Sequence, residues 1–461
     1  MRLRCPPDCR CSRGPSPRGC ARAPAPPSAR PSTSDPVSWE GYLFVYLPGE
    51  LEAVPTGRLV LEETGPESTA SRFGYGRRYL VRPNAVPVDP VSLPLSCLPG
   101  DEATYEPLHP PLFRAVRDAA PDFWGRRVIE ARLEAPPNSL PESAYLLHAG
   151  PHRFGALDFR PTLDSPETAG LLPPIAKLDY LMEAVERVEQ GLPMPAQLEP
   201  IFTGGTMGGA RPKALVIHRG EQYLAKFPAK GDGFDVPVVE RACLELARRA
   251  GLDVPPTELV RLADDRAVML IERFDRKAKG EGFLRRHAVS ALTLLAKDES
   301  ESLGARYEEI AERIGRLGVD GRVQADRNEL YGRIAFNILV SNDDDHLRNH
   351  AFVWDDVGKG WRLSPLYDVV PRPQVAAERY LHLSVGPRGR LATLDNLLEA
   401  HGAFGLLKRE AARIIERVAS VVREWRVVFE ELGVPEEQCE KVASAFRRPS
   451  DIGLEVVGKA R

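Results

Sequence analysis

The sequence places three consecutive carboxylates directly after an apolar segment. Residues 337–349 read NILVSNDDDHLRN, so Asp343, Asp344 and Asp345 precede Asn349 in one short stretch. Adjacent carboxylates repel one another, and such a cluster is stable when a cation or a hydrogen-bond network compensates its charge. Hard oxygen ligands of this kind suit magnesium. The alternative interpretation of a triple-Asp run is a solvated acidic turn that follows a helix.

A further carboxylate, Asp368, follows in the short apolar stretch LSPLYDVVP. Phosphoryl transfer needs one carboxylate to orient and deprotonate the attacking hydroxyl, and an Asn with a second carboxylate to hold the metal. The spacing Asp344-x-x-x-x-Asn349 matches the base and the Asn of the protein-kinase catalytic loop. His346 and His350 are not spaced with other ligands as a zinc site requires, so His346 is interpreted as part of the hydrogen-bond network of this loop.

Two upstream segments could hold phosphate groups. GGTMGGARPK, residues 204–213, carries four glycines ahead of a predicted strand, and glycine lets backbone amides approach phosphate oxygens. The loop fits neither common nucleotide-binding pattern, so a plain flexible loop is an equal alternative. Lys226 lies in an otherwise apolar strand and needs a compensating anion, for which Glu240 in the next helix is the candidate. A solvent-facing lysine on an edge strand is the alternative.

The first part of the chain is predicted to be rich in β-strands. Its expected elements are a hairpin over 39–61, a strand over 73–81, a helix over 112–134 and a surface helix over 179–190. We therefore expect a small β-rich subdomain over 37–160 and a connecting segment over 161–200.

The second part predicts a sheet followed by helices. Its expected elements are strands at 214–218, 223–227, 258–262 and 268–274, and helices at 238–250, 325–340, 404–431 and 436–447. The apolar strand that ends in MLIERFDR, residues 269–276, would bring backbone groups to an adenine edge between two lobes. The expected fold class is α+β, with a nucleotide-binding lobe over 201–275, a helical catalytic lobe over 276–448 and a C-terminal tail over 449–461.

The bulk composition excludes several classes of protein. The 461 residues include 62 basic and 65 acidic side chains, so the net charge of -3 gives no general attraction to nucleic acid or to anionic membranes. We find no apolar run long enough to span a bilayer and no signal peptide. The cysteines at 97, 243 and 439 are isolated in the sequence and are expected to be reduced, which favours a cytoplasmic protein.

The segment 1–36 differs in composition from the rest of the chain. It holds seven Arg and nine Pro with few large apolar residues, which predicts a disordered tail. Its cysteines at 5, 9, 11 and 20 lack the paired spacing of a closed zinc site. An alternative interpretation is that the tail is not translated and that the protein starts at Val37.

Five motifs carry a resemblance to a known family. GGARPK, AKFP, ERFDR, SNDDDHLRN and LSPLYDVVP occur in that order, and FGYGRRYL lies upstream of them. In this series the chain resembles the HipA-type serine/threonine kinases, the toxin components of type II toxin–antitoxin systems. The resemblance covers about residues 40–430. It implies a protein-kinase-like bilobal core with an N-terminal β-rich subdomain and a mainly helical C-terminal lobe, using ATP and Mg²⁺.

The resemblance also implies roles for single residues. Asp344 would be the general base, Asn349 and Asp368 the magnesium ligands, and Lys226 the phosphate-binding lysine. Glu272 and Phe274 would lie at the adenine, and Gly208, Gly209 and Lys213 would belong to the phosphate loop. Family members autophosphorylate a serine just before these glycines, and the nearest position in this sequence is Thr206.

The implied partners are proteins. One is a helix-turn-helix antitoxin of HipB type, and DNA would be contacted only through this antitoxin. The other is a protein substrate of the aminoacyl-tRNA synthetase class. Two alternatives remain at this point. A small-molecule kinase would use the same site residues. A catalytically weak nucleotide-binding co-repressor would be expected to lack the base or a metal ligand, and Asp344, Asn349 and Asp368 are all present.

Overall fold

The computed structural model describes residues 36–95, 104–109, 111–167, 170, 172–193 and 209–460. The chain divides into two units, 1–35 and 36–461, and the described residues belong to the second. The predictions for the tail up to residue 35, for Thr206 and for Gly208 lie outside the described residues.

The N-terminal subdomain is built on a five-stranded sheet of order β4-β3-β2-β1-β5. Its strands are β1 (Val37–Tyr46), β2 (Ala53–Thr64), β3 (Glu67–Tyr75), β4 (Thr104–Tyr105) and β5 (Leu157–Arg160). The predicted hairpin is confirmed, because β1 and β2 pair antiparallel. The next strand ends at Tyr75 instead of continuing to 81. The amide of Gly76 donates to the carbonyl of Thr56, and the short helix α1 (Arg77–Leu80) follows.

Helices complete this subdomain and make it more helical than the sequence predicted. The single helix expected over 112–134 is two, α2 (Arg114–Ala119) and α3 (Phe123–Arg132). Pro121 lies between them and has no amide hydrogen to continue a helix. Asp122 caps α3 by accepting a hydrogen bond from the amide of Gly125. The further helices are α4 (Glu142–His148), η1 (Ile175–Lys177) and α5 (Leu178–Glu189), the last as predicted.

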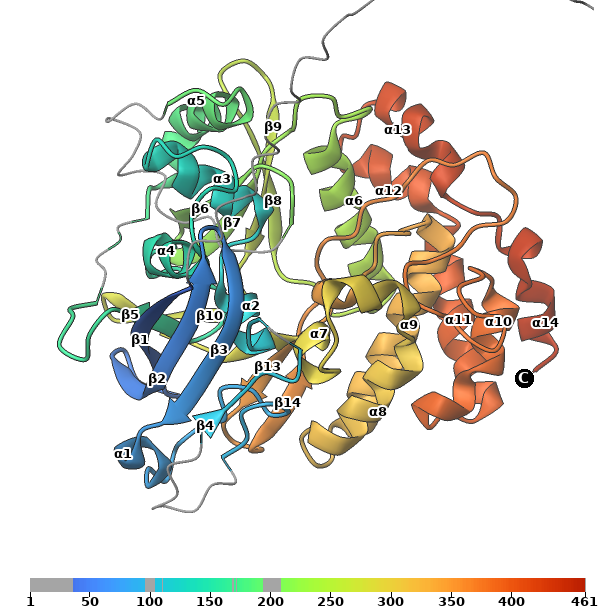
Figure 1. Ribbon diagram of the computed structural model, residues 1–461. Coiled ribbons are helices and arrows are strands. Elements are labelled where there is room, and N and C mark those ends of the chain that lie inside the picture. The colour runs from blue at the N-terminus through green and yellow to red at the C-terminus, as the bar shows by residue number, and fades with distance from the viewer. Residues whose placement is uncertain are drawn as a thin grey trace, which may run out of the picture. The chain divides into compact units, whose positions relative to one another are not determined.

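A four-stranded sheet of order β6-β7-β9-β8 forms the next lobe, here called the N-lobe. It comprises β6 (Lys213–His218), β7 (Glu221–Lys226), α6 (Val236–Arg249), β8 (Thr257–Arg261) and β9 (Ala267–Glu272), each close to its predicted range. Val216 and Ala225 are buried on the face covered by α3 and α5, and Leu215 and Leu224 on the face covered by α6. Figure 1 shows these helices on opposite sides of the sheet. Burial on both faces explains the nearly continuous apolar strands.

The remaining lobe, here called the C-lobe, is mainly helical as predicted. Its helices are α7 (Ala291–Leu294), η2 (Glu299–Gly304), α8 (Tyr307–Leu317), α9 (Val323–Val340), η3 (Leu347–Asn349), α10 (Leu394–Glu399), η4 (His401–Phe404), α11 (Lys408–Val422), α12 (Trp425–Glu431), α13 (Glu436–Val442), η5 (Ala443–Ala445), η6 (Pro449–Ile452) and α14 (Leu454–Gly458). The helix expected over 404–431 is thus divided into η4, α11 and α12. The segment expected to be a C-terminal tail folds into η6 and α14, because Ile452 and Val457 are buried in the core.

The C-lobe also contains strands that were not predicted. The hairpin β10 (Arg276–Lys279) and β11 (Gly282–Arg285) follows the N-lobe, and β12 (Ala288–Ser290), β13 (Ala351–Asp355) and β14 (Gly360–Leu363) form a small sheet. The strand β13 begins directly after the acidic loop, so this sheet fixes where that loop ends.

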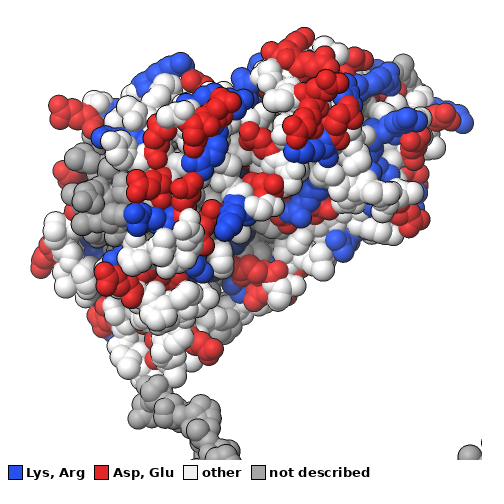
Figure 2. Space-filling view, turned by 90° about the horizontal axis from the view of Figure 1, so that it is seen from above, with Lys and Arg blue, Asp and Glu red and all other residues white. Residues whose placement is uncertain are grey.

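Further findings concern the cysteines, the helices and the surface charge. Cys243 and Cys439 are buried and free. None of the helices in the described ranges is long and apolar enough to cross a membrane. Figure 2 shows Lys and Arg side chains interspersed with Asp and Glu on the face that it presents, as expected of a nearly neutral chain.

Candidate active site

The acidic loop begins where α9 ends. Ser341 caps this helix in a left-handed conformation with φ of 52°, which turns the chain out of the helix. The loop is then held by Asp345, whose side chain is only 2% exposed. Asp345 accepts hydrogen bonds from Tyr307 Oη at 2.6 Å, Asn337 Nδ2 at 2.7 Å and His350 Nε2 at 3.0 Å. Burial would raise the pKa of Asp345, but the charge and hydrogen bond of His350 hold this pKa below its ordinary value.

The neighbouring Asp344 has a different environment. Its side chain is 53% exposed, and Arg372 Nη2 lies 2.6 Å from its carboxylate. The backbone carbonyl of Asp344 accepts a hydrogen bond from Asn349 Nδ2 at 3.0 Å. The side-chain nitrogen of Asn349 thus already has a hydrogen-bond partner. The side-chain oxygen, Oδ1, is the atom that can bind a metal ion. Asp344 is accessible to a substrate hydroxyl, whereas Asp345 is not.

Asp368 lies across the site from this loop and contacts the N-lobe. Lys226 Nζ is 2.9 Å from Asp368 Oδ1 and also forms an ion pair with Glu240, as the sequence predicted. Burial would lower the pKa of Lys226, but the charges of Asp368 and Glu240 raise it above its ordinary value. Burial would likewise raise the pKa of Asp368, but the Lys226 charge lowers it to about 2. Asp368 has a φ of 59°, an uncommon conformation for a residue with a side chain.

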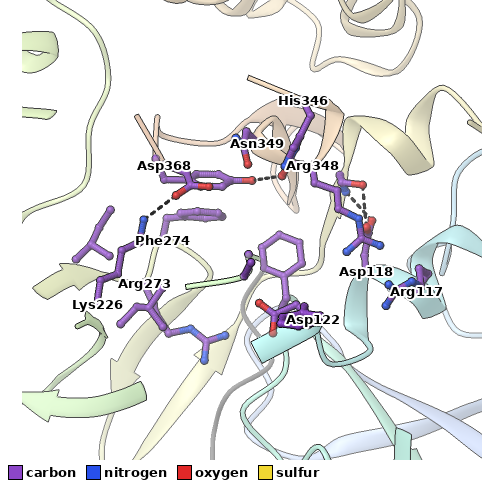
Figure 3. Close-up of a pocket in the computed structure, with 18 of the residues that line it drawn as sticks. Arg117, Asp118, Asp122, Lys226, Arg273, Phe274, His346, Arg348, Asn349 and Asp368 are labelled. Atoms are coloured by element: carbon purple, nitrogen blue, oxygen red, sulfur yellow. Dashed lines mark hydrogen bonds and ion pairs between the residues drawn. The ribbon is translucent and has the colours of Figure 1, made fainter. Parts of the chain in front are cut away.

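Beside Lys226 and Asp368 lies a cavity of about 310 Å³, here called the aromatic cavity. Its walls include Phe154, Phe274 and Tyr367. Phe274 stacks on Tyr367 with ring centroids 5.7 Å apart, and Phe154 meets Phe274 edge-on at 6.2 Å. Tyr367 Oη donates to the carbonyl of Arg348 at 2.8 Å, a bond drawn in Figure 3. Such a mainly apolar cavity with a few polar groups suits a nucleobase.

A second space of about 1000 Å³, here called the charged groove, adjoins the aromatic cavity. It shares Lys226, Asn349 and Asp368 with the aromatic cavity and adds Asp344 and Arg372. A charged lining of this kind suits phosphate groups and the hydroxyl that accepts a phosphoryl group.

The glycine loop is described from Gly209 onward. Gly209 has a φ of 118°, and a Cβ atom built there would lie 3.1 Å from Lys213 Nζ. Lys213 was predicted to belong to the phosphate loop, but it is the first residue of β6 and is 2% exposed. Its ammonium group contacts Asp122 Oδ2 and the carbonyl of Gly209, each at 2.8 Å. Its charge is therefore engaged within the protein.

The structure brings most of the predicted site residues together. The aromatic cavity or the charged groove is lined by Asp344, His346, Asn349, Asp368, Lys226, Lys213, Glu272, Phe274 and Gly209, while Glu240 lies behind Lys226. Glu272 accepts a hydrogen bond from Tyr223 Oη at 3.1 Å. The hydrogen-bond network expected around the His346 side chain is provided instead by Asp345. Within the described part of the chain, His346 Nδ1 is buried without a hydrogen-bond partner.

Sequence reasoning missed the contribution of the N-terminal subdomain. Five residues of this subdomain line the aromatic cavity, namely Arg117, Asp118, Asp122, Phe123 and Phe154. Most of them are labelled in Figure 3. Because no motif marks them, they were predicted only as parts of a helix and a loop. Arg348 and Tyr367 were also missed, although both adjoin the recognised Asn349 and Asp368.

The residues present fit a nucleotide with a magnesium ion. Asn349 Oδ1 and the carboxylate of Asp368 are hard oxygen donors, the type that Mg²⁺ prefers. Among the described residues no group of three or more His, Cys, Asp and Glu could hold a metal by itself. A Mg²⁺ ion usually takes one or two protein oxygens and completes its shell with phosphate oxygens and water.

The protein has the architecture of a two-lobed kinase fold, with a sheet-bearing N-lobe, a helical C-lobe and this site between them. A HipA chain from Shewanella oneidensis MR-1, solved in a complex of HipA, HipB and operator DNA, has the same fold, with a TM-score of 0.62 and 17% identity. The match covers 91% of this chain and 97% of that one.

Comparison of sequences identifies the family. Residues 205–425 match the family model of the HipA-like C-terminal domain. A protein of Sinorhizobium fredii (strain NBRC 101917 / NGR234) named "Putative kinase Y4mE" is 26% identical over 402 residues, which are 79% of this chain and 89% of that protein. A similarly named protein of Haemophilus influenzae is 26% identical over 193 residues, 37% of this chain and 55% of that protein. The chain thus contains a HipA-like C-terminal domain and is similar to proteins named as kinases, which supports a phosphotransferase.

Proposed function

We propose that the chain is an ATP- and magnesium-dependent serine/threonine protein kinase. The observation that supports this most is the convergence of Asp344, Asn349 and Asp368 beside the buried Lys226–Glu240 pair. These are the parts that phosphoryl transfer to a hydroxyl requires. The adjoining aromatic cavity provides a place for adenine.

Each group has a distinct part in the proposed reaction. The acceptor hydroxyl attacks the γ-phosphorus of ATP, ADP leaves, and the hydroxyl proton passes to the carboxylate of Asp344. Lys226 neutralises phosphate oxygens while Glu240 keeps its ammonium group in place. A bound magnesium ion, held by Asn349 and Asp368, would supply further neutralisation of phosphate charge. Asn349 is oriented for this role by the Asp344 carbonyl.

The test is phosphate incorporation from γ-labelled ATP into the protein itself and into proteins of a cell lysate. We expect the Asp344→Asn variant to lose about 100- to 10,000-fold in rate, the usual contribution of a general base. Asp356→Asn, which changes an exposed aspartate of the same lobe, should retain the rate. Mass spectrometry should locate any self-phosphorylation at Thr206. Full activity of Asp344→Asn would contradict the assignment of the base.

We further propose that the chain is the toxin of a toxin–antitoxin pair. The Shewanella HipA chain of the same fold was solved with HipB and its operator DNA. A helix-turn-helix antitoxin of HipB type would accordingly provide the DNA contact of this chain. The proposed substrate is a protein of the translation machinery, such as an aminoacyl-tRNA synthetase. Labelling of a small metabolite in place of a lysate protein would identify a small-molecule kinase instead.

A further inference from the structure

One short segment of the N-terminal subdomain contacts both kinase lobes. We call residues 117–124 the inter-lobe strap. On the C-lobe side, the carboxylate of Asp118 accepts three hydrogen bonds: from the amide of Ser290 at 2.7 Å, from Ser290 Oγ at 2.8 Å and from Thr293 Oγ1 at 2.6 Å. Asp118 is buried, and Ser290 caps α7. The strap is thereby fixed to the C-lobe.

On the N-lobe side, the strap holds the residue that follows the glycine loop. Asp122 Oδ2 lies 2.8 Å from Lys213 Nζ, and Trp124 Nε1 donates to the Lys213 carbonyl at 2.8 Å. The side chains of Lys213 and Asp122 are 2% and 6% exposed, so this ion pair is buried. Lys213 Nζ also donates to the carbonyl of Gly209. Asp122 is therefore linked to the glycine loop through a single ammonium group.

The position of Lys213 in the sheet explains why it needs its own carboxylate. Lys213 and Lys226 are directly opposite each other on β6 and β7. Like charges at opposed positions of a sheet repel. Lys226 is neutralised by Glu240 and Asp368, and Lys213 by Asp122. Lys213, Lys226 and Asp368 all line the charged groove. Without Asp122, the Lys213 ammonium group would compete with Lys226 for the carboxylate of Asp368.

We propose that Asp122 is a positioning residue for the nucleotide site. It keeps the Lys213 ammonium group bound to the strap, so that Asp368 stays available to a cation and the Gly209 backbone stays in place. This inference rests on the proposed function, because it assigns Asp122 to the site of magnesium and phosphate binding. Asp122 acts through Lys213 and takes no proton or phosphoryl group itself.

The first test measures binding of Mg²⁺-ATP to the full chain by calorimetry, together with KM and kcat. We expect Asp122→Asn, which keeps the helix cap, to weaken binding roughly 2- to 30-fold and to raise KM while kcat changes little. The matched control is Glu142→Gln, which removes another ion-paired carboxylate from the same subdomain, that of Arg126 and Glu142. The control should bind nucleotide normally. Equal binding by wild type and Asp122→Asn would overturn the proposal.

The second test is a double-mutant cycle with Lys213→Met, read by the same binding assay. Because Asp122 acts through Lys213, Asp122→Asn should add little to the effect of Lys213→Met. Additive effects would overturn this route of action. Amide hydrogen exchange without nucleotide should increase over 209–215 in Asp122→Asn but not in Glu142→Gln, and unchanged exchange there would also count against the proposal. Failure of the wild type to bind Mg²⁺-ATP would instead overturn the proposed function and this inference together.

Discussion

The aromatic cavity and the charged groove share the Lys226–Asp368 ion pair but differ in their other lining residues. The aromatic cavity has a volume of about 310 Å³ and is walled by aromatic rings such as that of Phe154. The charged groove has a volume of about 1000 Å³ and contains residues such as Asp344 and Arg372, which are each 53% exposed. Buried, packed groups define a binding shape, whereas exposed charges can change partners during a reaction. We therefore expect the cavity to govern the affinity for ATP and the groove to govern the rate of the proposed reaction.

The residue shared by both regions should show the largest effect. The Asp368→Asn variant removes a carboxylate that both pairs with Lys226 and is the proposed magnesium ligand. We expect its phosphotransfer rate to fall by at least about 100-fold, because metal-borne charge stabilisation contributes several kcal/mol to such reactions. In thermal unfolding, Mg²⁺ added to ATP should raise the Tm of the wild type further and leave that of the variant unchanged. Equal Tm shifts with and without Mg²⁺ in the wild type would remove Asp368 and Asn349 from a metal role.

A change in the cavity alone should affect affinity and spare the chemistry. Phe274→Ala removes the ring that stacks on Tyr367 and faces the proposed adenine position. Loss of a stacking ring costs about 1–3 kcal/mol per base, so ATP should bind roughly 5- to 150-fold more weakly. The rate at saturating ATP should stay near that of the wild type. Val375→Ala, at a fully exposed position, serves as the control in the same titration. A large fall in kcat with unchanged affinity would contradict the division between the two regions.

The most gradual effect concerns pH and the attachment of the N-terminal subdomain. His287 Nε2 lies 3.0 Å from the carbonyl of Val88, and burial lowers the pKa of His287 from 6.5 to about 4. The unfolded chain takes up this proton at higher pH than the folded one. The contribution of the neutral ring is therefore complete above pH 6.5 and is lost as the pH falls toward 4. We expect the free energy of unfolding to fall by up to about 1.4 kcal/mol per pH unit in this window from this group.

Denaturant unfolding at several pH values between 7 and 4 measures this slope. His287→Gln should reduce the slope, and His109→Gln, which changes a side chain that is 39% exposed, should leave it as in the wild type. An identical slope in His287→Gln and wild type would show that the pH dependence of stability arises from groups other than His287.

Much of the fold followed from the sequence because it depends on local patterns. The hairpin of β1 and β2 has alternating apolar residues around a Pro-Gly turn, and β6 and β7 form continuous apolar runs. These periodicities are properties of neighbouring residues, so they predict strands without knowledge of the partner. One error arose at Pro121, where the helical spacing on both sides was interpreted as one helix although the proline separates two. Short strands such as β12 carry too few residues to show a period.

The sequence by itself determined which groups are available for chemistry. Asp344, Asn349, Asp368 and Lys226 were identified from residue type and spacing, and the pairing of Lys226 with Glu240 was predicted because a buried ammonium group needs an anion. The order of these motifs also indicated the HipA-type family, which the comparisons confirm.

Only the tertiary structure decided how these groups differ. Asp344 and Asp345 are identical in type and adjacent in sequence, yet one is half exposed and the other is almost completely buried. The partners of Lys213 and Ser290, namely Asp122 and Asp118, lie far from them in the chain. Burial and electrostatic interaction depend on distances in space. No local pattern could therefore assign the inter-lobe strap to the nucleotide site.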